Sequence, residues 1–125
     1  MPWIVLMSSE VEAWLEGLDE DSQDAIAADV RVLEDIGPQL GRPYVDTLDD
    51  SRYRNLKELR THFGHHQYRI AFAFDPKRQA ILLLGGDKTG ANQRRFYNDL
   101  IHAAEAVLDR HLAQLAKQQA KERKP

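Results

Sequence analysis

The segment from Gln67 to Asp75 alternates between two kinds of side chain with a period of two, and this pattern constrains the fold most. One face of such a strand carries Tyr68, Ile70, Phe72 and Phe74, and the other carries Arg69, Ala71 and Ala73. A turn over residues 75–78 then leads into a strand predicted over 79–85, whose unbroken apolar run is typical of a central position in a sheet. The pattern therefore predicts an antiparallel hairpin at the centre of a sheet.

Helical and shorter strand patterns flank this hairpin. We predict a strand over 3–7, a helical hairpin that ends at about Ile36, a loop over 38–51, a strand over 53–60, a turn over 61–66 and a final helix from about Gln93 to Lys117. The order β-α-α-β-β-β-α describes an α+β fold, a small antiparallel sheet with helices on one side. Residues 1–117 are expected to form one domain, with residues 118–125 as a charged tail that frays.

Charge is distributed unevenly along the 125 residues. Residues 1–50 carry 13 acidic and 2 basic side chains, whereas residues 51–125 carry 7 acidic and 15 basic side chains. Such a division favours a basic surface that binds a polyanion. If the two halves of the sequence interleave in the fold, no such basic patch forms. Both interpretations stay open at this point.

Composition excludes several classes of function. The chain contains no cysteine, so disulfides, thiolate catalysis, Fe–S clusters and cysteine-bearing zinc sites are excluded. Its longest apolar runs, Trp3–Met7 and Ala80–Leu84, are far shorter than the roughly 20 residues of a membrane span. We expect a cytoplasmic protein without a membrane partner, without a metal ion and without a cofactor.

Basic and aromatic side chains gather around the predicted hairpin and the start of the last helix. They are Arg52, Arg54, Lys57, Arg60, His62, Arg69, Lys88, Arg94, Arg95 and Tyr97. Arg69 shares its strand face with two alanines, which predicts an open approach for a phosphate group. Such a surface suits binding of a phosphodiester, and RNA cleavage without a metal needs cations, a base and an acid. The alternative is that each is a solvated strand residue.

The motif Leu56-Lys57-Glu58-Leu59-Arg60, followed by Tyr68-Arg69-Ile70 and an apolar strand into Gly86-Asp87-Lys88-Thr89, resembles the RelE/HigB toxins, in particular their phage-derived HigB-like branch. The resemblance covers nearly the whole chain. It implies a microbial-ribonuclease-like fold, metal-independent cleavage of mRNA in the ribosomal A site, and neutralisation by a cognate antitoxin with a helix-turn-helix fold. The sequence lacks one cation of the family pattern after the last strand, where it reads Asp87-Lys88-Thr89-Gly90.

The resemblance also assigns roles to individual residues. The positions of the family's catalytic cations fall on Lys57, Arg60, Arg69 and Lys88. Contacts to RNA are expected from Arg52, Arg54, His62, Arg94, Arg95 and Tyr97. Two alternatives remain, a ParE-like protein that poisons DNA gyrase and a degenerate member that only binds its antitoxin. The antitoxin could dock on the basic face or on the acidic helical hairpin.

Overall fold

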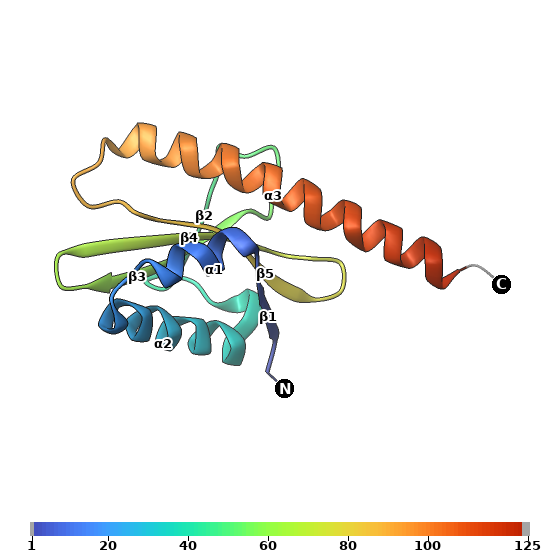
Figure 1. The fold of residues 1–125 in the computed structure, drawn as a ribbon, viewed down its shortest axis with the longest axis horizontal. Coiled ribbons are helices and arrows are strands. Elements are labelled where there is room, and N and C mark those ends of the chain that lie inside the picture. Colours follow the sequence, from blue (N-terminus) through green and yellow to red (C-terminus); the bar gives the residue numbers. More distant parts are fainter. Residues whose placement is uncertain (1, 124–125) are drawn as a thin grey trace.

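A five-stranded sheet with the strand order β1-β5-β4-β3-β2 forms the centre of the computed structural model, which describes residues 2–123 (Figure 1). The strands are β1 (Ile4–Met7), β2 (Val45–Thr47), β3 (Lys57–Phe63), β4 (His66–Phe74) and β5 (Gln79–Asp87). The helices are α1 (Ser9–Glu16), α2 (Glu20–Ile36) and α3 (Gln93–Glu122), with a short 3₁₀ helix, η1, at Gly37–Gln39. The predicted α+β fold, with its central β4–β5 hairpin, is confirmed.

Three of the four strand pairs are antiparallel, and the fourth, between β1 and β5, is parallel. This parallel pair joins two segments far apart in the chain, so no tight turn dictates its direction. The segment predicted as a loop over 38–51 contains η1 and β2. The strand predicted over 53–60 instead runs from Lys57 to Phe63, and only Gly64 and His65 form the turn before β4.

Helices cover both faces of the sheet, so the expectation that they lie on one side was wrong. Tyr68, Ile70 and Phe72 pack in a core cluster with side chains of α1 and α2, whereas Ala71 and Ala73 pack with α3. Because the central strands are apolar on both faces, each face requires a cover. Figure 1 shows α3 along one side of the sheet and α2 along the other.

Helix α3 begins at an Asn92 cap, whose side chain accepts a hydrogen bond from the backbone N–H of Arg95. The helix ends at Glu122 rather than at the predicted Lys117, so most of the segment expected to fray is helical; its last two residues lie outside the described region. Figure 1 shows the C-terminal part of α3 extending beyond the sheet. Within residues 2–123, no helix has both the length and the apolarity to cross a membrane.

Polar side chains fix the two N-terminal helices in place. Ser8 caps α1 by accepting a hydrogen bond from the backbone N–H of Val11, and its hydroxyl donates to the carbonyl oxygen of Leu83 on β5. Gln23 Nε2 on α2 donates to the carbonyl oxygens of Leu15 and Leu18 at 2.7 and 3.2 Å. These bonds anchor α1 to the sheet and α2 to α1.

Candidate active site

A cleft of about 630 Å³ opens between β2, β3 and the first turns of α3. Its walls include basic, acidic and aromatic side chains from four parts of the chain, namely Arg42, Asp46, Glu58, Arg60, Lys88, Arg94 and Tyr97. Strand β3 supplies Glu58 and Arg60 because residues two apart project from the same sheet face. The cleft therefore collects charges from the acidic N-terminal half and from the basic remainder of the chain.

A network of Glu58, Arg69 and Tyr97 connects the wall of the cleft to the protein interior behind it. Arg69 Nε is 3.3 Å from Glu58 Oε1, and these two residues are 1% and 4% exposed. Tyr97 Oη donates to Glu58 Oε1 at 2.8 Å and accepts from Arg69 Nε at 3.3 Å, while Arg69 Nη1 donates to the carbonyl oxygen of Tyr68. Burial, together with the hydrogen bond to the Glu58 carboxylate, raises the pKa of the Tyr97 phenol.

Arg60 is the register partner of Arg69 on the neighbouring strand, so two guanidinium groups share one sheet face. Like charges placed opposite each other on adjacent strands repel. Carboxylates on both sides of Arg60 offset this repulsion, because Arg60 Nη1 lies 3.9 Å from both Glu58 and Asp46. Asp46 also binds Arg42. Arg60 is partly exposed to the cleft, unlike Arg69.

Lys88 follows directly after β5 and lies at the edge of the same cleft. Within residues 2–123 it forms no ion pair, and its Nζ is 5.8 Å from the centre of the Tyr97 ring. Partial burial and the guanidinium groups of Arg69 and Arg60 lower the pKa of the Lys88 ammonium group. Among the described residues Lys88 is thus a cation without a bound carboxylate, and its charge can attract an anion into the cleft.

The segment that carries Lys88 is held by hydrogen bonds from both sides. The Lys88 N–H donates to the carbonyl oxygen of Gln67, and Asp87 Oδ1 accepts from the N–H groups of Gln67 and Thr89. Asp87 Oδ2 binds His66 Nδ1 at 2.6 Å. Partial burial opposes ionisation of Asp87, but the hydrogen bonds from Thr89, His66 and Gln67 prevail and lower its pKa to about 2.

The structure brings together only part of the predicted site. Arg60, Lys88, Arg94 and Tyr97 line the cleft, and Arg69 lies behind it. The open approach expected for Arg69 was wrong, because Ala71 and Ala73 admit α3 instead of a ligand and Arg69 is buried beneath it. His62 and Arg95 are exposed and lie outside the residues that line the cleft.

Three other predicted residues lie away from the cleft. Lys57 alternates with Glu58 along β3 and belongs to the opposite face, the one on which Leu59 packs beneath α2. Arg52 and Arg54 precede β3 rather than lining up along a strand. Arg52 forms ion pairs with Glu105 and Asp109 on α3, which hold the loop against that helix.

Sequence reasoning gave no site role to the carboxylates of the cleft. The signal for Glu58 is its spacing, because it lies two residues before Arg60 on one strand and so shares its face. Asp46 and Arg42 lie in the segment predicted as a loop, and no pattern in that segment indicated β2. The electrostatic balance of the cleft depends on these residues, because Glu58 pairs with Arg60 and Arg69, and Asp46 pairs with Arg60 and Arg42.

Comparison with known proteins identifies relatives over most of the chain. A family described as phage-derived protein Gp49-like (DUF891) matches residues 13–109. A protein of Mycobacterium tuberculosis (strain ATCC 25618 / H37Rv) named putative toxin HigB2 is 45% identical over 115 residues, which cover 91% of this chain and 57% of that protein. Putative toxin HigB3 of the same strain is 45% identical over 109 residues, which cover 87% of this chain and 93% of that protein. The chain thus spans less than two thirds of HigB2 but nearly all of HigB3.

Proposed function

The chain belongs to the phage-derived Gp49-like family. We propose that it is the toxin of a toxin–antitoxin module and that this toxin cleaves mRNA on the ribosome without a metal ion. The resemblance to HigB-type toxins is confirmed at the level of the family by the two relatives named as putative toxins. The observation that carries the activity is the cleft in which Arg60, Lys88 and Tyr97 meet above the buried Arg69–Glu58 pair.

Cleavage of RNA at this cleft would begin with attack of the 2′-oxygen on the adjacent phosphorus, while the 2′-hydroxyl proton passes to a water molecule. The P–O5′ bond then breaks, and the 5′-oxygen takes up a proton, so that a cyclic phosphate and a 5′-hydroxyl result. Negative charge grows on the phosphate oxygens in between, and fixed cations stabilise it. Arg60 and Lys88 both line the cleft and can supply that charge.

Lys88 is suited to a second role as the acid for the leaving oxygen. Its lowered pKa makes the ammonium group a stronger acid than an ordinary lysine, while its position beside two arginines keeps an anion in reach. Arg69 acts as a positioning residue, since its guanidinium is bound by Glu58, Tyr97 and the Tyr68 carbonyl oxygen. Tyr97 completes the wall of the cleft between these groups.

The test is cleavage of a defined mRNA by the purified chain in the presence of programmed ribosomes, with the new 5′ ends mapped. We expect cuts in the A-site codon that are absent with Lys88→Ala and unchanged with Lys77→Ala, a matched control on the exposed β4–β5 turn. A toxic protein that leaves mRNA intact but blocks DNA supercoiling by gyrase would instead support the ParE-like alternative. A chain with neither activity that still binds its antitoxin would support the degenerate alternative.

A further inference from the structure

His66 and Asp87 form a hydrogen-bonded pair at the point where β5 ends. His66 Nδ1, on the first residue of β4, lies 2.6 Å from Asp87 Oδ2, on the last residue of β5. The carboxylate of Asp87 is ionised at neutral pH, because its pKa is about 2, and an ionised carboxylate only accepts hydrogen bonds. Nδ1 of His66 therefore carries a proton and donates the hydrogen bond to Asp87.

The same carboxylate holds the backbone on both sides of Lys88. Asp87 Oδ1 accepts hydrogen bonds from the backbone N–H groups of Gln67 and Thr89, at 3.2 and 2.9 Å. Thr89 Oγ1 also accepts from the Gln67 N–H, at 2.9 Å, and donates to a carbonyl oxygen of the turn before β4. We call His66, Asp87 and Thr89 the β4–β5 clamp. Its side chains continue the pairing with β4 beyond the last residue of β5.

The clamp determines which way Lys88 points. Asp87 and Thr89 both turn their side chains toward the start of β4, where the Gln67 N–H donates to each of them. Lys88 stands between them in the chain and lines the cleft, whereas Asp87 and Thr89 do not. Within residues 2–123, no ion pair fixes the ammonium group of Lys88. Its place in the cleft therefore depends on the backbone that the clamp holds.

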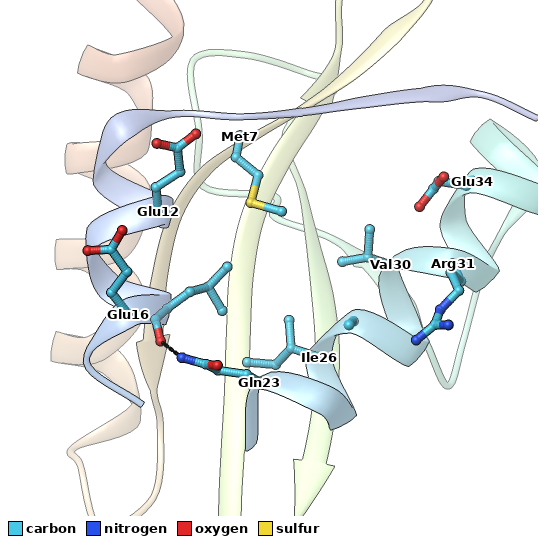
Figure 2. Close-up of a pocket in the computed structure, with 10 residues that line it drawn as sticks. Met7, Glu12, Glu16, Gln23, Ile26, Val30, Arg31 and Glu34 are labelled. Carbon is cyan, nitrogen blue, oxygen red and sulfur yellow. Dashed lines mark hydrogen bonds between the residues drawn. The ribbon is translucent and has the colours of Figure 1, made fainter. Parts of the chain in front are cut away.

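The ring of His66 is itself fixed by the fold. It stacks on the ring of Tyr68, with the ring centroids 5.2 Å apart and the planes 14° from parallel. The Tyr68 hydroxyl shares a buried hydrogen bond of 2.8 Å with Ser22 Oγ in the first turn of α2. The next residue of α2, Gln23, donates a hydrogen bond to the carbonyl oxygen of Leu15 on α1, as drawn in Figure 2. The Nδ1 donor of the clamp is thus connected to the two helices on the sheet face opposite the cleft.

We propose that His66 and Asp87 are positioning residues for Lys88, and that the clamp they form directs the Lys88 ammonium group into the cleft, toward the phosphate of bound RNA. This inference rests on the proposed function, because it concerns the geometry of that same site. Neither His66 nor Asp87 lines the cleft, so they act on RNA through Lys88. A lysine side chain is flexible, and fixing its backbone in advance lowers the entropic cost of placing its charge.

Two replacements of His66 separate its hydrogen bond from its ring. His66→Asn places an amide nitrogen where Nδ1 lies, so it keeps a donor for Asp87 but loses the ring that stacks on Tyr68. His66→Phe keeps a ring against Tyr68 but has no donor. The matched control is His65→Asn, since the His65 side chain forms no hydrogen bond within the described residues. The His66 and Asp87 side chains are 36% and 31% exposed, so these variants are expected to fold, and circular dichroism verifies it.

The first measurement is mRNA cleavage over a range of concentrations of programmed ribosomes. We expect His66→Phe to lower the maximal rate by about tenfold or more, because the charge at the phosphate is misplaced. The ribosome concentration that gives half the maximal rate should stay unchanged, because the residues that line the cleft are intact. His66→Asn and His65→Asn should cleave within about threefold of the unaltered chain. A role of His66 in packing alone would instead impair His66→Asn more than His66→Phe.

The second measurement needs no ribosome. NMR of isotopically labelled lysine side chains follows the titration of Lys88, whose signal is identified by its absence in Lys88→Ala. Partial burial and the guanidinium groups of Arg69 and Arg60 lower the pKa of Lys88 in the unaltered chain, while Glu58 acts in the opposite direction. His66→Phe should raise this pKa toward its ordinary value, because the side chain can then leave the cleft for water. The other two variants should leave the pKa unchanged.

The outcomes distinguish this inference from the proposed function. If the unaltered chain cleaves mRNA and His66→Phe keeps either its maximal rate or its Lys88 pKa, the positioning role is overturned and the proposed function stands. If His66→Asn is as impaired as His66→Phe, the ring rather than the hydrogen bond matters, and the positioning role is overturned too. If the unaltered chain cleaves no mRNA, the proposed function fails, and the pKa of Lys88 in His66→Phe alone supports or overturns the clamp.

Discussion

Arg60 and Arg69 face each other across β3 and β4, and the carboxylate of Glu58 lies within 4 Å of both guanidinium groups. The buried Arg69 binds Glu58 and Tyr97 in the protein interior. The partly exposed Arg60 borders the cleft. One carboxylate thus stabilises a pair of cations that would otherwise repel each other. The catalytic proposal depends on this arrangement, because the buried Arg69–Glu58 pair supports the strand face from which Arg60 borders the cleft.

Replacement of Glu58 by glutamine is expected to destabilise the fold, because Arg69 is left as a buried charge without its counterion. Breaking a buried ion pair on one side costs about 3–5 kcal/mol in the free energy of unfolding. Urea denaturation of Glu58→Gln measures this loss. Asp50→Asn, at an exposed position beside the cleft, serves as the control and is expected to change the free energy of unfolding by less than about 0.5 kcal/mol.

A double variant separates charge from packing in that pair. Glu58→Leu combined with Arg69→Met removes both charges, and we expect it to be more stable than either single replacement, since no buried charge remains. If Arg69→Met alone had the same free energy of unfolding as the unaltered chain, the ion pair would make no contribution to stability. The free energies of unfolding of the four proteins give the coupling between the two residues.

Replacement of Lys88 by alanine is expected to abolish most of the activity without affecting the fold, because Lys88 forms no ion pair within the described residues. Loss of a preorganised donor to the transition state costs about 2.7–4 kcal/mol, or a factor of 10²–10³ in rate. Activity of the unaltered chain should also fall as the pH rises through the lowered pKa of Lys88, at a lower pH than for an ordinary lysine. A rate that is independent of pH in the alkaline range would contradict this role.

Stability in acid should depend on Asp87. Its pKa is about 2 in the folded chain against 3.8 for an ordinary aspartate, so its contribution is present above pH 3.8 and is lost as the pH falls through 2. Because the side chain is partly exposed, we expect a contribution of about 1 kcal/mol. The difference in free energy of unfolding between the unaltered chain and Asp87→Asn should therefore be larger at pH 6 than at pH 2. A constant difference would refute the linkage.

Gly85 should not tolerate a side chain. A Cβ at this position would lie 2.3 Å from the Trp14 ring, which packs directly on the strand. We expect Gly85→Ala to lower the free energy of unfolding by about 1–3 kcal/mol, the usual cost of an overfilled core. Gly41→Ala is the control, since a Cβ there has no heavy atom within 4 Å. Thermal unfolding of both variants provides the comparison.

The strands with a complete apolar pattern could be predicted from sequence, and those without one could not. The alternation along Gln67–Phe74 defines both faces of β4 correctly, since its two sets of side chains enter different core clusters. Strand β2 has only three residues, Val45–Thr47, and pairs with β3 through contacts that no local pattern reports. The strand predicted over 79–85 extends to Asp87, and Gly85 and Gly86 within it admit Trp14 and Phe96 against β5.

The site was predicted less well, for a related reason. The sequence shows which residues are basic. Whether a basic side chain can contact a ligand depends on which helix or strand packs over it in the fold. The two alanines that suggested space beside Arg69 provide space for α3 instead. The position of Lys57 could have been corrected from sequence alone, because a one-residue offset from Glu58 places it on the other face of β3.

Lys57 and Arg60 offer a sharp test of which sheet face carries the activity. They lie three residues apart on β3 and project from opposite faces, Arg60 into the cleft and Lys57 toward the side covered by α2. Both were predicted as catalytic cations, and only Arg60 is in position to contact RNA in the cleft. Replacement of each by glutamine removes one positive charge and keeps a side chain of similar length.

We expect Arg60→Gln to reduce ribosome-dependent cleavage by about 10²-fold, because a cation opposite the developing phosphate charge is lost. Lys57→Gln should keep cleavage within about threefold of the unaltered chain, since its charge is separated from the cleft by the sheet. Initial rates with a saturating amount of programmed ribosomes measure both, and urea denaturation verifies that Arg60→Gln is folded at the assay temperature. An equal loss of cleavage rate in the two variants would mean that the sheet face beneath α3 is not the reactive face. It would contradict the catalytic roles assigned to Arg60 and Lys88.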